Sequence, residues 1–246
     1  MTTFVLIPGF WLGAWSWRDV AADLRGRGHE VHALSLTGMG ERAHLAGPDT
    51  DLETHVTDTL NLFRYEELDD VVLVGHSYAG ALVTPSVADR VPERIAKLVF
   101  VDTGPLPEGM SQADFTTSGE EASGEEASGE EASGEEASGG PAREVAHEIP
   151  APPWEQVVPG HAERLTRLSV PQPGATATSP VHYTGAWEKL PRLFVMSSFT
   201  EADVKAMAGT VPAFQHMSGE FRELPGSHWP MIDQPAALAA ILHDAA

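Results

Sequence analysis

Short apolar runs that alternate with helical segments constrain the fold of this chain more than any other sequence feature. Residues 3–8, 69–75 and 95–102 are nearly continuous in apolar side chains, as expected of strands buried on both faces of a sheet. Alternation of strands with helices predicts an α/β protein with a doubly wound, mostly parallel sheet. The full series predicts strands at 3–8, 29–36, 69–75, 95–102, 191–199 and 219–226, and helices at 14–28, 50–68, 78–92, 200–209 and 234–246.

Local signals accompany three of these helices. Thr50 and Glu53 have the spacing of a capping box, in which the two side chains satisfy each other's backbone N–H groups. Thr200 and Asp203 have the same spacing, which gives Asp203 a structural explanation. Pro85 interrupts the helical pattern in which it lies, because its ring removes a backbone donor.

The alternating pattern stops between residues 103 and 185, a stretch rich in Pro, Gly and Glu. It is too long for an ordinary loop in a compact domain, so we expect a cap or lid inserted into a core made of 1–102 and 186–246. Helical pieces are expected at 142–149 and 162–168. The low-complexity tract 118–140 begins with four copies of SGEEA, whose Ser-Gly pairs favour a flexible excursion, and we assign it no chemistry.

Composition and charge exclude several classes of protein. The net charge is −21, or −13 without the eight glutamates of the SGEEA copies, and an acidic surface disfavours nucleic acid and anionic membranes. The chain has no cysteine, which excludes disulfides and thiolate chemistry. We find no phosphate-binding glycine loop and no dense cluster of metal ligands, so no metal or organic cofactor is expected. Without a basic leader or an apolar run of about 20 residues, we expect a soluble, cytoplasmic protein, and the oligomeric state stays open.

One short motif carries candidate chemistry. The sequence GHSYAG at residues 75–80 fits G-x-S-x-G, and it lies between a predicted buried strand and a predicted helix. That context is the one a nucleophile elbow requires, because the sharp turn exposes the serine at the carboxyl end of the strand. Ser77 is therefore the candidate nucleophile, with His76 expected to point away from it and to help set the turn.

Several longer stretches carry a family resemblance. They are LIPGFWLGAWSW, SLTGMGERAHL, VVLVGHSYAGALV, LVFVDTGPLPEG and ELPGSHWPM. Together they resemble the α/β-hydrolase superfamily, and within it the small esterase branch that contains plant methylesterases and hydroxynitrile lyases. The resemblance covers most of the chain outside 103–185. It implies that His228 is the general base and that the reaction is ester hydrolysis through an acyl-enzyme.

Two positions in the sequence are candidates for the acid that completes such a site. The commonest position in this fold follows the penultimate strand, where the chain offers no aspartate at the strand end and only Glu201 and Asp203 beyond it. The other position follows the strand after the nucleophile helix, where Asp102 ends an apolar run and needs a partner. We favour Asp102, with the Glu201/Asp203 pair and a dyad without an acid as alternatives.

The residues around the nucleophile complete the expected site. The backbone N–H groups of Phe10 and Tyr78 are the expected oxyanion donors, although the loop before Phe10 reads Pro-Gly where the family usually has His-Gly. Trp11, Trp229 and Trp154 are expected to line an apolar substrate pocket.

These residues predict a serine hydrolase that cleaves small, uncharged carboxylic esters. A C–C lyase of the hydroxynitrile-lyase type is an alternative, but that branch relies on a lysine where this chain has Trp229. A non-catalytic small-molecule-binding protein on the same fold is the other alternative. Ser77 also excludes the aspartate-nucleophile chemistry of epoxide hydrolases.

Overall fold

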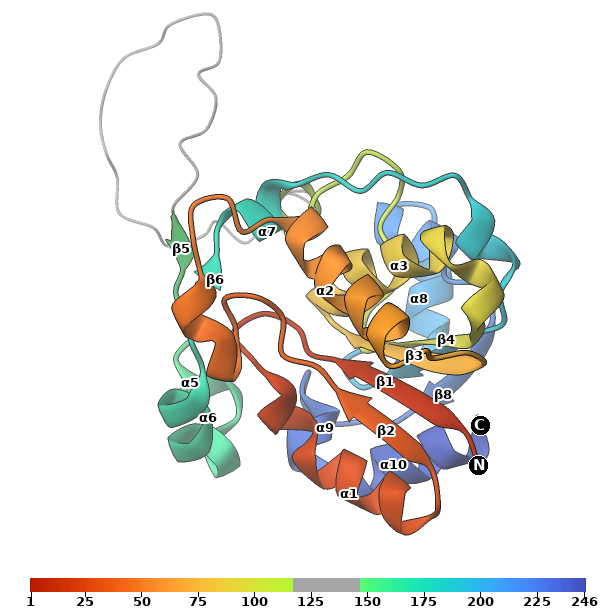
Figure 1. Cartoon of the computed structure of the whole chain (residues 1–246), viewed down its shortest axis with the longest axis horizontal. Coiled ribbons are helices and arrows are strands. Elements are labelled where there is room, and N and C mark those ends of the chain that lie inside the picture. Colours follow the sequence, from red (N-terminus) through yellow and green to blue (C-terminus); the bar gives the residue numbers. More distant parts are fainter. Residues whose placement is uncertain (117–146) are drawn as a thin grey trace, which may run out of the picture.

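A six-stranded sheet forms the centre of the computed structural model, which describes residues 1–116 and 147–246 (Figure 1). The strand order is β2-β1-β3-β4-β7-β8, and every neighbouring pair is parallel. The predicted doubly wound parallel sheet is therefore confirmed. The strands are β1 Thr3–Ile7, β2 Glu30–Ala33, β3 Val71–His76, β4 Ile95–Val101, β7 Arg192–Met196 and β8 Glu220–Glu223.

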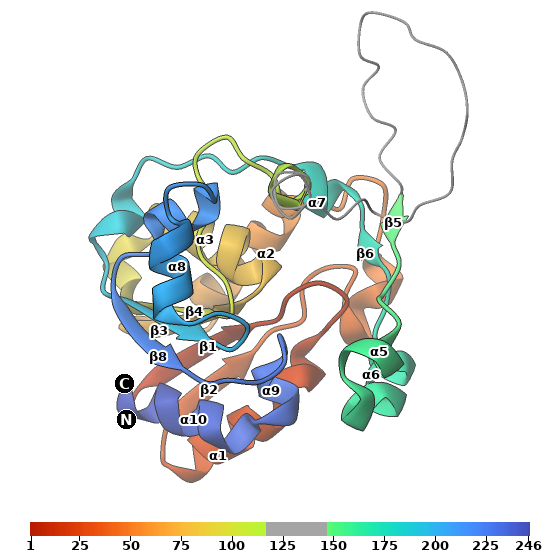
Figure 2. The same ribbon diagram turned by 180° about the vertical axis from the view of Figure 1, so that it is seen from behind.

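Helices cover both faces of the sheet, as the continuous apolar strands require (Figures 1 and 2). On β1, Val5 and Ile7 join one core with α2, α3 and α8, whereas Phe4 and Leu6 join the other core with α1, α9 and α10. The helices are α1 Arg18–Gly26, α2 Leu52–Tyr65, α3 Thr84–Arg90, α8 Glu201–Met207, α9 Pro230–Asp233 and α10 Pro235–Asp244. Short 3-10 helices occur at Ala14–Trp17, Gly40–Leu45, Pro92–Arg94, Pro159–His161, Ala186–Lys189 and Pro212–His216.

Two predicted helix starts differ in the structure. The N-cap of α2 is Asp51, one residue later than expected, and its partner in the capping box is Thr54 instead of Glu53. Asp51 prevails because its carboxylate accepts from both the N–H and the hydroxyl of Thr54, at 2.8 Å each. The segment predicted as one helix over 78–92 begins as a π-helical turn at Ala79–Val83 and continues as α3, with Pro85 in the first turn of α3.

Between β4 and β7, residues 147–173 lie beside the carboxyl ends of the strands, and the 3-10 helix at Ala186–Lys189 packs against α3 (Figure 1). The helix predicted at 162–168 is confirmed as α6 Ala162–Leu168. The prediction of a helix at 142–149 is wrong for its last two residues, because these form β5 Glu148–Ile149, which pairs antiparallel with β6 Gln172–Pro173. The tract 118–140 lies outside the described residues, and the division into core and cap stays a prediction. The remaining elements are α5 Trp154–Val157, α7 Ala175–Thr178 and a helical turn at 112–116.

Strand register places the ends of β3 and β4 side by side. His76 pairs with Val101 in the parallel ladder, so the next residues, Ser77 and Asp102, leave the sheet at the same level. The ladder continues through them, because Ser77 N–H donates to Val101 O at 3.2 Å and Asp102 N–H donates to Val195 O at 2.8 Å. Within the described part of the chain, no helix has the length and apolarity that crossing a bilayer requires.

Candidate active site

Ser77 lies at a sharp turn between β3 and the π-helical turn that follows it. Its φ is +50°, in the left-handed region that non-glycine residues rarely adopt. Gly75 and Gly80 let the strand and helix approach so closely, since a Cβ on Gly75 would lie 2.7 Å from the Gly80 Cα. The strand–turn–helix geometry predicted for GHSYAG is therefore present in the structure.

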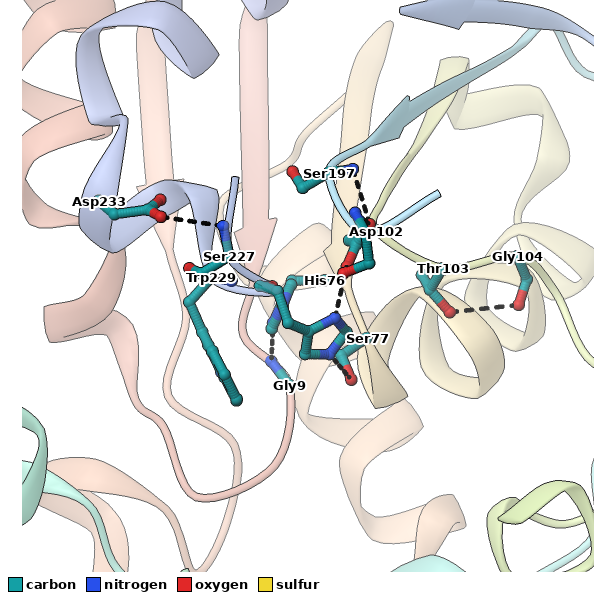
Figure 3. Close-up of polar contacts among 12 residues, drawn as sticks. Gly9, His76, Ser77, Asp102, Thr103, Gly104, Ser197, Ser227, Trp229 and Asp233 are labelled. Atoms are coloured by element: carbon teal, nitrogen blue, oxygen red, sulfur yellow. Dashed lines mark hydrogen bonds and ion pairs between the residues drawn. The ribbon is translucent and has the colours of Figure 1, made fainter. Parts of the chain in front are cut away.

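A chain of hydrogen bonds joins three side chains at the ends of β3 and β4 and in the loop before α9 (Figure 3). Asp102 Oδ2 lies 2.6 Å from His228 Nδ1, and His228 Nε2 lies 2.9 Å from Ser77 Oγ. A carboxylate only accepts hydrogen bonds, so Nδ1 carries the proton and Nε2 is left as the acceptor for the Ser77 hydroxyl. This tautomer is the one that a general base beside a serine needs.

Four hydrogen bonds hold the Asp102 carboxylate, whose side chain is fully buried. Oδ1 accepts from the N–H groups of Ser197 and Ser198 at 2.7 and 2.8 Å, and Oδ2 accepts from the Ser198 hydroxyl and from His228 at 2.6 Å each. Burial by itself would raise the pKa of Asp102, but these donors outweigh it and hold the pKa well below its usual value. The group is therefore an anion at neutral pH.

The other candidate acids lie elsewhere. Asp203 caps its own helix, accepting from the N–H and hydroxyl of Thr200 at 2.9 and 2.6 Å, which confirms the predicted capping box. Glu201 forms an ion pair with Lys205 at 2.6 Å on the surface of α8. The structure therefore brings Asp102 to His228 and leaves the Glu201/Asp203 pair in the helix cap.

Sequence reasoning missed Ser197 and Ser198, which follow β7 directly. They occupy the strand end where the commoner acid position lies, and they donate to Asp102 across the sheet. A signal was present in the sequence, since two serines stand there in place of an aspartate.

Two backbone N–H groups near Ser77 have no acceptor within the described residues. They belong to Phe10 and Tyr78, the expected oxyanion donors. The rings of these two residues pack together with centroids 4.5 Å apart, which ties the loop after β1 to the start of the π-helical turn. Tyr78 is further held by its hydroxyl, which lies 3.0 Å from His55 Nδ1.

Trp11 fastens this loop to the segment between β4 and β7. Its backbone is left-handed, with φ +66°. Its N–H donates to Gln172 Oε1 at 3.2 Å, its indole N–H donates to Ile149 O at 3.2 Å, and its carbonyl accepts from Val170 N–H at 3.1 Å. Gln172 is almost fully buried, and nothing in the sequence around it indicated this contact.

His76 was expected to help set the turn, and its ring also joins two loops. Nδ1 accepts from Gly9 N–H at 3.3 Å, so Nε2 carries the proton and donates to the carbonyl of His228 at 2.7 Å (Figure 3). Burial, and then the neighbouring His228, lower the pKa of His76 to about 3, so the ring is neutral at physiological pH.

A cavity of about 280 Å³ opens beside Ser77 and His228. The expected pocket residues Trp11, Trp154 and Trp229 are not among the residues that line it. They pack against one another instead, with the Trp154 ring centroid 6.1 Å from that of Trp11 and 5.0 Å from that of Trp229, within the core that contains α1 and α10. The apolar wall of the cavity is formed by Ala81, Leu106, Phe115, Met196, Phe199 and Phe214.

Solved structures share this fold over nearly the whole chain. An extracellular alpha/beta-hydrolase from a Paenibacillus species matches with a TM-score of 0.76 and 21% identity, covering 100% of this chain and 99% of that one. A mutant of tomato methylketone synthase I matches with a TM-score of 0.74 and 20% identity, covering 99% of this chain and 97% of that one. At these identities the likeness concerns the fold.

Sequence relatives and a family model are more specific. A carbendazim-hydrolysing esterase of Nocardioides sp. (strain SG-4G) is 52% identical over 102 residues, which are 42% of each chain. Methylesterase 8 of Arabidopsis thaliana is 35% identical over 113 residues, 46% of this chain and 41% of that protein, so the match spans less than half of either relative. A model of the alpha/beta hydrolase family matches residues 4–241. The chain therefore belongs to the alpha/beta hydrolase family.

Proposed function

We propose that the protein is a serine hydrolase that cleaves small, uncharged carboxylic esters. Ser77 is the nucleophile, His228 the general base and acid, and Asp102 the carboxylate that orients His228. The observation that carries the proposal is the continuous hydrogen-bond chain from Asp102 through His228 to Ser77, at 2.6 and 2.9 Å. The relatives named as an esterase and a methylesterase support ester hydrolysis as the reaction.

The reaction proceeds in two halves. Ser77 Oγ attacks the ester carbonyl carbon while its proton passes to His228 Nε2, and the developing oxyanion accepts from the N–H groups of Phe10 and Tyr78. His228 then returns the proton to the leaving alkoxide, and the C–O bond to the alcohol breaks. A water molecule, deprotonated by His228, attacks the acyl-enzyme, and the carboxylic acid leaves as Ser77 regains its proton.

The cavity supports uncharged substrates. Its wall is mainly apolar, and no lysine or arginine stands among the residues that line it. Asp102 is the one carboxylate in that lining, and its two oxygens already accept four hydrogen bonds from Ser197, Ser198 and His228. An ionised substrate group would therefore lose hydration without gaining a partner.

We further infer that the segment 103–185 acts as a cap over this site. Leu106, Gln112 and Phe115 from its first part line the cavity, and Gln172 from its last part bonds to Trp11 in the loop after β1. Both contacts support a role for this segment in shaping the substrate pocket.

Hydrolysis of 4-nitrophenyl acetate tests the proposal. We expect turnover by the wild-type protein and none above background by Ser77→Ala, with equal circular dichroism for the two proteins. A fluorophosphonate probe is expected to add to Ser77, located by mass spectrometry of the digest. Equal rates for wild type and Ser77→Ala would overturn the proposal.

A further inference from the structure

Two adjacent serines follow β7, and their side chains differ in what they contact. Both donate their backbone N–H groups to Asp102 Oδ1, Ser197 at 2.7 Å and Ser198 at 2.8 Å. The Ser198 hydroxyl donates to Asp102 Oδ2 at 2.6 Å, whereas the Ser197 hydroxyl is buried and has no partner within the described residues. Of the two hydroxyls, only that of Ser198 therefore acts on the carboxylate.

Ser198 is the one residue of this pair that holds both oxygens of the carboxylate. Its N–H reaches Oδ1 and its hydroxyl reaches Oδ2, which together fix the plane of the group. The torsion that turns an aspartate carboxylate about its Cβ–Cγ bond has broad minima, so contacts and not the bond itself set that plane. Without the hydroxyl, the bonds from this strand end would all meet Oδ1 and leave Oδ2 free to swing.

The direction of Oδ2 matters because this oxygen contacts the candidate base. His228 Nδ1 lies 2.6 Å from it, and His228 Nε2 lies 2.9 Å from Ser77 Oγ. If His228 were the only donor to Oδ2, the carboxylate would follow the ring that it has to orient. The Ser198 hydroxyl gives Oδ2 a second donor that does not depend on the ring.

The end of β7 is a firm base for that donor. β7 pairs with β4 on one side and with β8 on the other. Beyond the strand, Ser197 O accepts from Gly226 N–H at 3.4 Å, in the loop that leads to His228. The contact from Ser198 therefore fixes the carboxylate relative to the sheet.

We propose that Ser198 is a positioning residue of the active site, whose hydroxyl holds Asp102 Oδ2 so that His228 stays aligned with Ser77. This inference rests on the proposed function and deepens it, because it adds a group that acts on the reaction through Asp102 and His228 in turn.

Removal of the hydroxyl tests the proposal. A misplacement of about 1 Å can cost about 10²-fold in rate, and Ser198→Ala keeps three of the four bonds to the carboxylate. We therefore expect kcat for 4-nitrophenyl acetate to fall by about tenfold while KM changes little. Thr200→Val is the matched control, because it removes a hydroxyl that donates to Asp203 at the same 2.6 Å, and it is expected to keep wild-type kcat. Wild-type kcat in Ser198→Ala, or an equal loss in both variants, would overturn the inference.

Conservative variants separate the hydroxyl from the shape of the side chain. Ser198 is exposed, so we expect the extra methyl group of Ser198→Thr to be accommodated and its hydroxyl to recover most of kcat. A threonine variant as slow as Ser198→Ala would count against the hydroxyl. If Ser198→Ala is poorly folded, Ser198→Cys replaces it, because a thiol is a weaker donor, and we expect kcat to fall several-fold. Wild-type kcat in Ser198→Cys would refute the role equally.

Proton NMR tests the same contact without ester turnover. The proton between His228 Nδ1 and Asp102 is expected to give a low-field resonance that is absent in His228→Ala. We expect this resonance to shift or broaden in Ser198→Ala and to stay in place in Thr200→Val, and an unchanged resonance in Ser198→Ala would contradict the inference. Absence of turnover by the wild-type protein would instead contradict the proposed function, while the resonance still decides the role of Ser198.

Discussion

At the scale of single residues, two non-glycine residues with left-handed backbone orient the side chains of the site. Ser77 and Asp102 both have φ of +50°, a conformation that costs about 1–3 kcal/mol per residue and persists only where surrounding structure enforces it. Hydrogen bonds to the neighbouring strands hold this conformation, because the N–H groups of Ser77 and Asp102 each donate to a carbonyl of the next strand. Both side chains therefore turn away from the sheet end and toward His228.

Asp102→Asn tests the role of the carboxylate. The asparagine oxygen can still accept from Ser197 and Ser198, but its NH₂ group then faces His228 Nδ1 and favours the tautomer that cannot accept from Ser77. We expect kcat for 4-nitrophenyl acetate to fall by about 10⁴-fold, the effect known for the same change in chymotrypsin-like proteases, with an unchanged circular dichroism spectrum.

Asp203→Asn is the matched control for that variant. Asp203 caps α8 and lies apart from the hydrogen-bond chain, so we expect kcat within a few-fold of wild type. Near-normal turnover by Asp102→Asn, or a large loss in Asp203→Asn, would contradict the assignment of the acid.

His76→Phe tests the bridge between the two loops. The phenyl ring keeps the volume but leaves the Gly9 N–H and the His228 carbonyl unpaired, which together cost about 2–6 kcal/mol of unfolding free energy. Because both loops contribute to the site, we expect kcat to fall while KM changes little. Urea unfolding and steady-state kinetics measure the two effects.

A conservative variant separates positioning from packing at this residue. The amide of His76→Gln can both accept and donate, so we expect it to recover part of kcat relative to His76→Phe. If both variants keep wild-type kcat despite lower stability, His76 acts through packing alone.

Single-residue chemistry was readable from sequence only in part. The motif and its flanking strand predicted the turn at Ser77. The position of Asp102 at a strand end favoured it over the Glu201/Asp203 pair, but sequence does not show which carboxylate reaches His228. The hydrogen bonds of Ser197 and His76 link residues 95 and 152 positions apart along the chain. Contacts of that range have no local pattern.

At the scale of elements, the sheet was predictable because period and apolarity are local properties. The four inner strands β1, β3, β4 and β7 follow apolar runs, and their parallel orientation follows from the helices between them. The pairing of β5 with β6 was not predicted, because two residues carry too little pattern and their pairing depends on chain about 24 residues away. A similar limit applies to α2, where Thr50 and Asp51 are both acceptable caps by sequence and only geometry selects Asp51.

Gln172→Leu tests the coupling between β6 and the loop after β1. The change removes the acceptor of Trp11 N–H and frees the left-handed turn that follows Phe10. Complete loss of one oxyanion donor lowers kcat by about 10²–10³-fold. A Phe10 amide that is displaced but still present loses only part of this stabilisation, so we expect kcat to fall by about tenfold with little change in KM. Gln215→Leu, at an exposed position, is the control and is expected to behave as wild type.

A boronic acid inhibitor gives this prediction an independent measurement. Its adduct with Ser77 places an oxygen at the oxyanion position, so the inhibition constant of Gln172→Leu is expected to rise by the same factor as kcat falls. An unchanged inhibition constant would show that Gln172 does not act through the Phe10 amide.

At the scale of the whole molecule, two apolar cores on opposite faces of one sheet hold the chain together. The N- and C-terminal ends lie close to each other, and α1 packs against α10 on the same face (Figures 1 and 2). The sequence predicted this layout through its buried strands. It did not predict how residues 147–185 attach, because that depends on individual contacts such as Trp11 with Gln172.

Buried neutral histidines make the stability of the whole molecule depend on pH. Burial lowers the pKa of His55. Burial, and to a smaller extent the neighbouring His228, lowers the pKa of His76 to about 3. Unfolding restores an ordinary pKa near 6.5, so below about that pH the unfolded chain binds protons that the folded protein does not. The stability is therefore fully present above about pH 6.5 and is lost progressively as the pH falls, for His76 down to about pH 3.

His55→Gln tests this dependence in urea unfolding between about pH 7.5 and 5. Each such histidine contributes a slope of at most about 1.4 kcal/mol per pH unit, so we expect the variant to lose part of the wild-type slope, up to that limit. The glutamine amide can replace the hydrogen bonds of His55 to Tyr78 and to Thr37 O, so the variant differs from the wild type mainly in lacking a titratable group. His44→Gln, at an exposed position, reports any general effect of removing a histidine. An identical pH slope in wild type and His55→Gln would contradict the prediction, because a histidine buried in neutral form must take up its proton on unfolding.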